Sequence, residues 1–201
     1  MKKSILLTDV DGVCLSWVSG FAMYASRVLN RNISGQPSTY DMTEWLGLKT
    51  YDEVEKYITL FNEGEWEFGC LPEMANSVNN LQKIHNSNVD IIAITCCSID
   101  KATKSLRHAN LFHTFGPIFK EIVFLPLGTS KINELEKFKD RNVIGWVEDK
   151  VSAAYEGKEL GYDTFLIKSE YSKKHELENP RDLQYVNTWD EITPKILNKL
   201  N

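Results

Sequence analysis

The stretch Ser4-Ile-Leu-Leu-Thr-Asp-Val-Asp-Gly12 decides the expected fold of this 201-residue chain. Its apolar half is typical of a strand buried on both faces, and the Asp-x-Asp-Gly that follows is typical of a turn. Asp9 and Asp11 stand two residues apart at the strand end. Their carboxylates therefore point to the same side and repel each other unless a cation or a shared proton compensates. Magnesium prefers such oxygen-rich sites, and Gly12 allows the backbone to turn sharply after them. The alternative is a pair of turn aspartates that cap a helix.

Four further apolar runs follow, at residues 89–95, 122–125, 143–147 and 164–167. Between them lie patterns with helical spacing, at 72–85, 101–109, 130–138 and 151–160, and a last short helix is expected at 189–197. Pro72 stands where a first helical turn begins, and Gly161 where a helix ends. Continuous apolar strands that alternate with helices predict an α/β fold, with a parallel sheet covered on both faces. In such sheets ligands bind at the carboxyl ends of the strands.

Residues 17–68 interrupt this alternation, because they contain no strong strand run. They are instead rich in aromatic residues. We expect a small helical insertion after the first strand, placed over the end of the sheet where ligands bind. For any one aromatic side chain two interpretations stay open: it faces a substrate, or it belongs to the core of the inserted helices.

Other strand and helix ends carry residues suited to phosphate chemistry. Thr95 ends the second apolar run, and its hydroxyl and the backbone N–H of Cys96 are suited to hold a phosphoryl oxygen. Lys131 starts a helical pattern and can balance carboxylates or bind phosphate as a point charge. Glu148 and Asp149 follow the fourth run, where one of them can complete a metal site. Each has an ordinary alternative: a β-branched strand end, a solvated lysine, or acidic residues favoured in a first helical turn.

Taken in order, these residues resemble the four motifs of the haloacid dehalogenase superfamily, and the resemblance spans nearly the whole chain. It implies a Rossmann-like, doubly wound parallel sheet with a small helical cap inserted after the first strand. The implied division is a core domain of residues 1–15 and 70–201 and a cap domain of residues 16–69.

The resemblance also implies roles for single residues. Asp9 matches the nucleophile that forms an aspartyl-phosphate intermediate. Asp11 matches the general acid that protonates the leaving oxygen and then the base that activates water. Thr95, Cys96 and Lys131 match the residues that hold the phosphate. The implied magnesium ligands are Asp9, Asp149 and the backbone carbonyl of Asp11. Glu148 and Gly12 are implied to support this site without binding the ion.

Asp11 further implies a phosphatase or phosphotransferase, because the dehalogenases of this superfamily lack that residue. Residues 40–48, 66–68, 71–75 and 185–192 resemble the 5'(3')-deoxyribonucleotidase group, which implies a 5'-nucleotidase acting on (deoxy)nucleoside monophosphates. The aromatic residues implied to stack on a nucleobase are Trp17, Phe21, Trp45 and Trp66. The sequence departs from the pattern at 96–98, where two cysteines make sensitivity to oxidation a further hypothesis.

Composition limits the partners. The net charge of −5 gives no general attraction to nucleic acid or to an anionic membrane. No stretch approaches the ~20 apolar residues that span a bilayer, and two carboxylates interrupt the apolar start, unlike a secretory signal. The four cysteines match no zinc pattern and indicate reduced thiols in a cytoplasm.

Three alternatives remain beside the nucleotidase. The first is a phosphatase for another small ester, such as a sugar phosphate. The second is a non-catalytic protein of the same fold that binds a nucleotide or a partner without turnover. The third, a phosphatase for nucleic-acid ends, is disfavoured by the acidic balance and the absence of a basic stripe.

Overall fold

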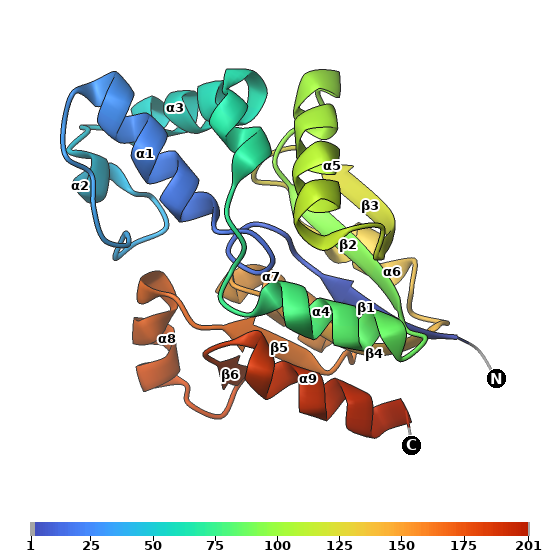
Figure 1. Ribbon diagram of the computed structural model, residues 1–201. Helices are drawn as coiled ribbons and strands as arrows, with labels where there is room; N and C mark the ends of the chain where they lie inside the picture. The colour runs from blue at the N-terminus through green and yellow to red at the C-terminus, as the bar shows by residue number, and fades with distance from the viewer. Residues whose placement is uncertain (1–2, 201) are drawn as a thin grey trace.

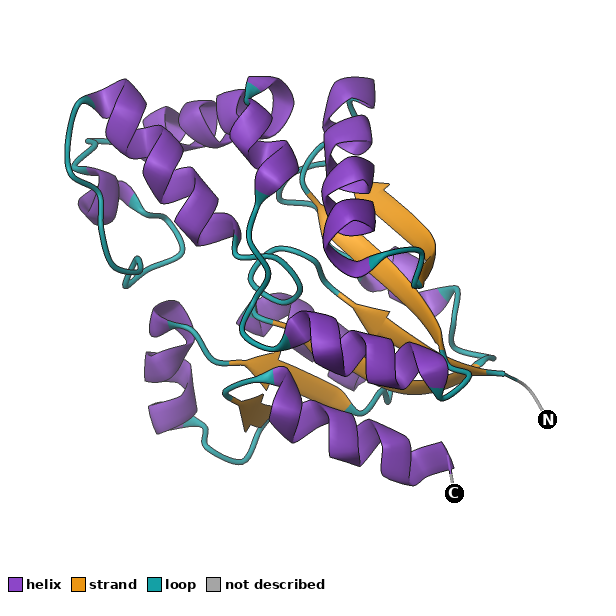
Figure 2. Cartoon of the chain, in the orientation of Figure 1, coloured by secondary structure: helices purple, strands orange, loops and turns teal. Residues whose placement is uncertain are grey.

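Six strands form one parallel sheet in the computed structural model, which describes residues 3–200 (Figure 2). The strands are β1 (Ser4–Thr8), β2 (Asp90–Cys96), β3 (Phe119–Leu125), β4 (Asn142–Glu148), β5 (Thr164–Ile167) and β6 (Gln184–Val186). They lie in the order β3-β2-β1-β4-β5-β6, and every neighbouring pair is parallel. The expected α/β fold with a parallel sheet is confirmed.

Helices connect the strands and cover both faces of the sheet. The α-helices are α1 (Trp17–Leu29), α2 (Thr43–Leu46), α3 (Tyr51–Gly64), α4 (Ser77–Asn86), α5 (Lys101–Phe115), α6 (Ile132–Glu136), α7 (Val151–Glu159), α8 (Lys173–Glu178) and α9 (Trp189–Leu197). Shorter 3-10 helices are η1 (Trp66–Cys70), η2 (Glu170–Ser172) and η3 (Asn198–Leu200). Figure 1 shows α4 and α9 side by side on one face of the sheet and α6 and α7 on the other.

The strand order places a switch point between β1 and β4. From β1 the chain runs outward to β2 and β3, then returns to β4 beside β1 and runs outward again to β5 and β6. The connections after β1 and β4 therefore diverge to opposite sides, which leaves a crevice at their carboxyl ends. Asp9 directly follows β1, and Glu148 and Asp149 stand at the end of β4. The fold thus brings these three residues to one place.

The insertion after β1 forms α1, α2, α3 and η1, which lie together over the carboxyl ends of the strands (Figure 1). Its aromatic residues Phe21, Phe61 and Phe68 are fully buried and belong to the same apolar cluster as Leu6 and Ile91 of the sheet. One continuous core therefore joins the inserted helices to the sheet. The division into a core domain and a cap at residues 16–69 stays a prediction.

The segment that begins at Pro72 differs from expectation, because α4 starts only at Ser77. Ser16 N donates to Pro72 O at 2.8 Å, and Met74 N donates to Cys14 O at 2.8 Å. This segment thus runs along the loop that follows β1 instead of forming a first helical turn. β6 is a second departure, since its three residues are too few to give a strand pattern.

Candidate active site

The loop after β1 presents Asp9 at the floor of the site. Asp9 N donates to Val147 O at 2.9 Å, which extends the pairing of β1 with β4 by one residue. The chain then turns at Gly12, whose φ of +78° is a backbone conformation that L side chains rarely adopt. A Cβ at Gly12 would collide with the Asp149 carboxylate. The glycine thus permits both the turn and the approach of Asp149.

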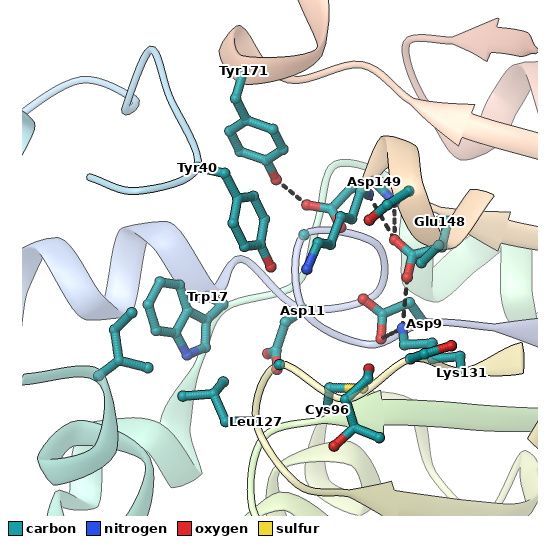
Figure 3. A pocket seen from close by; sticks show the side chains of 18 of the residues that line it. Asp9, Asp11, Trp17, Tyr40, Cys96, Leu127, Lys131, Glu148, Asp149 and Tyr171 are labelled. Atoms are coloured by element: carbon teal, nitrogen blue, oxygen red, sulfur yellow. Dashed lines mark hydrogen bonds and ion pairs between the residues drawn. The ribbon is translucent and has the colours of Figure 1, made fainter. Parts of the chain in front are cut away.

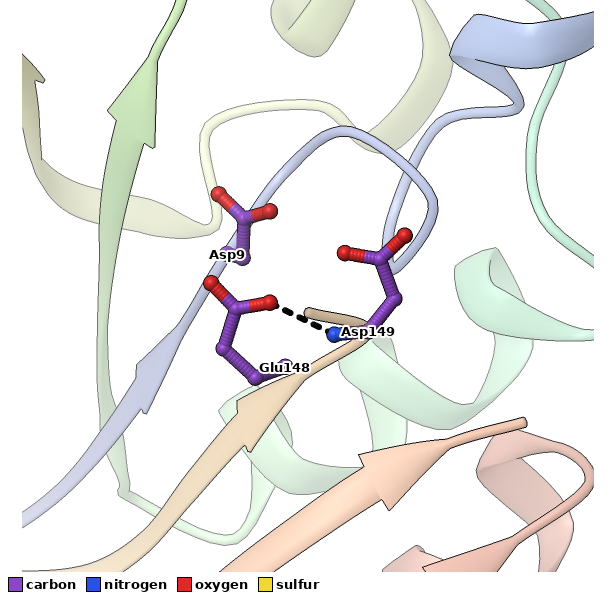
Figure 4. A group of neighbouring side chains, drawn as sticks. All are labelled: Asp9, Glu148 and Asp149. Atoms are coloured by element: carbon purple, nitrogen blue, oxygen red, sulfur yellow. Dashed lines mark hydrogen bonds between the residues drawn. The ribbon is translucent and has the colours of Figure 1, made fainter. Parts of the chain in front are cut away.

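Three carboxylates meet at this point (Figure 4). Asp9, Glu148 and Asp149 are buried, and each contributes an oxygen that lies within 4.8 Å of the others. Glu148 Oε2 accepts from the backbone nitrogens of Asp149 at 2.6 Å and Lys150 at 2.7 Å. Glu148 Oε1 accepts from Lys131 Nζ at 2.6 Å. Both Glu148 oxygens are therefore engaged by donors, which leaves Asp9 and Asp149 as the carboxylates suited to hold a cation.

Lys131 supplies positive charge between the carboxylates. It is the N-cap residue of α6, and its ammonium lies 2.7 Å from Asp9 Oδ1 and 2.6 Å from Glu148 Oε1. Its backbone nitrogen donates to Glu156 Oε2 at 2.7 Å, which fixes the start of the helix. Glu156 was not expected, because a carboxylate inside α7 has no sequence signal that links it to Lys131.

Burial dominates the ionisation of this cluster. It raises the pKa of Asp9 from 3.8 to about 7 against the opposing effect of Lys131, and Glu148 adds to the rise. Burial and Glu148 raise the pKa of Asp149 well above its ordinary value. Burial alone would lower the pKa of Lys131, but the two carboxylates raise it overall, so the ammonium stays charged. Three carboxylates against one ammonium leave two negative charges in formal terms, which a divalent cation would balance.

Thr95 and Cys96 end β2 on the other side of Asp9. Thr95 is fully buried, and its hydroxyl Oγ1 has no hydrogen-bond partner among residues 3–200. A buried hydroxyl without a partner costs free energy, so its position favours a ligand oxygen nearby. Cys96 lines the cavity and its Sγ lies 3.3 Å from Thr129 O. Burial raises the pKa of Cys96 to about 12, which disfavours the reactive thiolate and argues against the oxidation hypothesis.

Asp11 has a partner that the sequence did not indicate. Arg107 of α5 is fully buried, and its Nη2 donates to Asp11 Oδ1 at 2.7 Å and Oδ2 at 2.9 Å. Burial raises the pKa of Asp11, and Arg107 opposes that rise. The Asp11 carboxylate is therefore directed away from the Asp9–Lys131 pair, toward a separate cation.

Two tyrosines that were not among the predicted site residues complete the wall above Asp149 (Figure 3). Tyr171 of η2 donates its hydroxyl to Asp149 Oδ2. Burial and Asp149 raise the pKa of Tyr171 well above its ordinary value, so the phenol stays protonated and donates. Tyr40 packs edge-on against Tyr171 with 5.5 Å between ring centroids, and the Lys150 ammonium lies 4.5 Å from the Tyr40 ring centroid.

A cavity of about 420 Å³ opens in front of these groups. The residues of the site that line it are Asp9, Asp11, Gly12, Trp17, Tyr40, Cys96, Lys131, Glu148, Asp149 and Tyr171. The structure thus brings most of the expected site residues to one cavity, with Thr95 buried just behind it.

Of the four aromatic residues expected to contact substrate, only Trp17 lines this cavity. Phe21 is fully buried and stacks on Trp17 with 4.5 Å between ring centroids. Trp45 Nε1 donates to Ser34 O at 3.0 Å, and Trp66 is 67% exposed. The structure therefore places Phe21 in the core and leaves Trp45 and Trp66 away from the site.

Asn62 of α3 ties the insertion to the site. Its Oδ1 accepts from Trp17 Nε1 at 3.0 Å, and its Nδ2 donates to Cys97 O at 3.1 Å. One buried amide thereby fixes the indole that lines the cavity relative to Cys97, the first residue after β2.

No protein-family model matches the sequence. The chain is 26% identical over 211 residues to an uncharacterised 32.4 kDa protein from the Gp30–rIII intergenic region of enterobacteria phage T4, covering 96% of this chain and 70% of the phage protein.

Solved structures give the fold more directly. A predicted phosphatase from Clostridium acetobutylicum superposes with a TM-score of 0.65 at 15% identity, over 98% of this chain and all of that chain. D,D-heptose 1.7-bisphosphate phosphatase from B. bronchiseptica, complexed with magnesium and phosphate, superposes with a TM-score of 0.59 at 12% identity. The match covers 98% of this chain and 99% of that chain. Similar structures also include dehalogenases. The chain has the fold of these hydrolases. Among residues 3–200, no helix is long and apolar enough to cross a membrane.

Proposed function

We propose that this chain is a magnesium-dependent phosphomonoesterase that works through an aspartyl-phosphate intermediate. The observation that carries the proposal is the cluster of Asp9, Asp149 and Lys131 at the switch point of the sheet, facing a cavity. Phosphoryl transfer needs a positioned nucleophile and compensated charge more than any other contribution from the protein, and the cluster is suited to provide both.

The donor set fits magnesium. Asp9 and Asp149 offer hard carboxylate oxygens, while Glu148 is occupied in orienting its neighbours. We propose Asp9, Asp149 and the Asp11 backbone carbonyl as ligands, supported by Glu148 and Gly12. When bound, magnesium lowers the repulsion between the Asp9 carboxylate and the phosphoryl oxygens.

In the first half of the proposed reaction, an Asp9 carboxylate oxygen attacks phosphorus and the bond from phosphorus to the ester oxygen breaks. Asp11 gives its proton to that oxygen, so the product leaves as an alcohol and Asp9 carries the phosphoryl group. The Lys131 ammonium, the Thr95 hydroxyl and the Cys96 N–H would hold the phosphoryl oxygens. The buried Thr95 hydroxyl without a partner supports this assignment.

In the second half, the Asp11 carboxylate takes a proton from water, whose oxygen attacks phosphorus. The bond from phosphorus to Asp9 breaks and inorganic phosphate leaves. Asp9 is again a carboxylate and Asp11 again carries a proton, so one water is consumed per ester cleaved. Asp11 is directed away from Asp9, which suits a group that serves the leaving oxygen and the water in turn.

For the substrate we propose a (deoxy)nucleoside monophosphate, with residues 16–69 as a helical cap over a core of residues 1–15 and 70–201. Trp17, Tyr40 and Tyr51 line the cavity and offer ring faces or edges to a base. The four cysteines are free, which is consistent with the cytoplasmic setting that we propose.

Phosphate release from a panel of nucleoside monophosphates and sugar phosphates, with magnesium or with EDTA, tests the proposal. We expect release from nucleotides that requires magnesium and disappears in Asp9→Asn. Asp52→Asn, an exposed position in the first turn of α3, is the matched control and should keep full activity. Release from sugar phosphates alone would discard the nucleotide and keep the mechanism. No magnesium-dependent release from any ester would favour a protein that binds without turnover.

A further inference from the structure

Arg107 lies behind the cavity, outside all of the sequence motifs. It occupies the middle of α5, is fully buried, and does not line the cavity itself. Asp11 stands between the two, since it lines the cavity and binds Arg107 through both carboxylate oxygens. A carboxylate held by both oxygens has lost the freedom to rotate about its last bond.

The surroundings of Arg107 fix the guanidinium itself. Its Cζ lies 4.1 Å from the centroid of the Phe68 ring, which stacks against it from η1. Within residues 3–200, Nε and Nη1 are buried and have no hydrogen-bond partner. The side chain therefore makes its hydrogen bonds through Nη2, and both go to Asp11.

This arrangement is a poor way to stabilise the fold. Burying a guanidinium costs more hydration free energy than one ion pair returns unless its remaining donors are satisfied, and two donor atoms of Arg107 are not. An apolar side chain at position 107 would fill the same space without that cost. The pair is better explained by what it does to Asp11.

We propose that Arg107 is a positioning residue for the general acid–base step: it holds the Asp11 carboxyl group at the place where the ester oxygen leaves and water later arrives. This inference rests on the proposed function. Figure 3 shows Asp11 between Trp17 and Asp9, on the part of the cavity wall away from the Asp9–Lys131 pair. Asp11 gives a proton to the leaving oxygen and later takes another from water.

The test uses two leaving groups. Transfer of phosphate from 4-nitrophenyl phosphate hardly needs an acid, because nitrophenolate leaves readily without a proton. Transfer from an alkyl ester, such as a nucleoside monophosphate, needs one. For Arg107→Met we expect kcat/KM to fall by about 100-fold or more with the alkyl ester and by less than about fivefold with the nitrophenyl ester. Arg27→Met removes the exposed ion pairs to Glu65 and Glu67 and should change neither value.

A double substitution separates positioning from a structural role. In the Asp11→Asn background, Arg107→Met should lower kcat/KM for the alkyl ester by no more than about twofold, because its effect passes through Asp11. If the loss of kcat/KM in the double variant equals the product of the losses in the two single variants, the proposal is wrong. Equal losses with both esters in Arg107→Met would also overturn it.

Two further variants guard against misfolding of Arg107→Met. Arg107→Lys keeps the charge but loses the planar guanidinium that packs on Phe68, and Phe68→Leu removes the ring that fixes the guanidinium. Both should show the same preference for the nitrophenyl ester with smaller losses, and the absence of that preference in both would refute positioning. A wild-type chain that releases phosphate with neither ester overturns the proposed function and this inference together, whereas equal losses with an active wild type overturn the inference alone.

Discussion

Lys131→Met removes the positive charge at the centre of the proposed site and keeps much of the side-chain volume. The ammonium lies 2.7 Å from Asp9 Oδ1 and 2.6 Å from Glu148 Oε1, and the side chain is 5% exposed. Breaking a buried ion pair by removing one partner costs about 3 to 5 kcal/mol, because the remaining charge is poorly solvated. We therefore expect the free energy of unfolding to fall by about 3 kcal/mol or more at pH 8.

The same substitution should be less harmful in acid. Without Lys131, Asp9 loses the partner that lowers its pKa, so its pKa rises beyond the wild-type value of about 7. At pH 5.5 the folded variant then holds a protonated Asp9, and less unpaired charge is buried. We expect the loss to shrink to about 1 to 2 kcal/mol there.

Urea unfolding followed by tryptophan fluorescence, in EDTA at pH 5.5 and pH 8, measures both values. Added magnesium should restore part of the stability at pH 8, because a divalent cation replaces the missing charge. Lys137→Met is the control: Lys137 is 63% exposed and pairs with Glu134, and an exposed pair contributes less than about 1 kcal/mol. A loss no larger than the control, or the same loss at both pH values, would refute the view that Lys131 compensates the carboxylates.

Three further predictions concern the same cluster. Without magnesium, the free energy of unfolding of the wild type relative to Asp9→Asn should fall as pH rises from 3.8 to about 7, because folded wild type keeps a proton on Asp9 that the unfolded state has released; paired urea titrations of the two proteins across this range check it. Gly12→Ala should abolish magnesium binding measured by calorimetry, since the added methyl meets the Asp149 carboxylate, whereas Gly161→Ala has a similar positive φ with nothing within 4 Å and should lower stability alone. Tyr171→Phe should bind magnesium about fivefold more tightly in calorimetry, because the hydroxyl that occupies Asp149 Oδ2 is gone.

Each of these predictions has an outcome that contradicts it. The same pH dependence of stability in the wild type and in Asp9→Asn would mean that Asp9 titrates normally in the folded chain. Equal magnesium affinity in the two alanine variants would remove the steric argument at Gly12. Weaker magnesium binding by the phenylalanine variant would mean that Tyr171 orients Asp149 instead of competing for it.

The strands were predictable because strands buried on both faces are continuous apolar runs. β1 and β5 begin and end at the expected residues, Ser4–Thr8 and Thr164–Ile167. Expectation failed where local pattern competes with tertiary contacts. Pro72 suits a first helical turn, yet its carbonyl accepts from Ser16, and the helix starts later.

Five residues of the site could be expected to lie close together because they stand at strand and helix ends: Asp9, Asp11, Lys131, Glu148 and Asp149. Parallel topology brings such ends to one edge of the sheet, so sequence position was enough to expect proximity.

The rest of the site depends on contacts between distant segments. Arg107 lies 96 residues from Asp11, inside a helix where an arginine looks like any solvated residue. Tyr171 lies 22 residues after Asp149 in a short 3-10 turn. The sequence shows that the insertion is rich in aromatic residues, but not which of them face the cavity. Trp17 lines the cavity, whereas Phe21 stacks on Trp17 in the core. Only the fold distinguishes these cases.

One apolar cluster runs from β1 and β2 into α1, α3 and η1. Its packing therefore also affects the fraction of molecules in which the site is assembled. Two units with separate cores could melt one after the other, but a shared core makes loss of the insertion and loss of the sheet one cooperative event. A cavity-forming substitution at Phe61, in α3, would therefore lower the population that presents Asp9 to substrate as effectively as one at Leu6, in β1. When a protein is only marginally stable, the fraction of folded, active molecules depends on its stability. In this chain that fraction depends on the aromatic packing of the insertion as much as on the strands that carry the carboxylates.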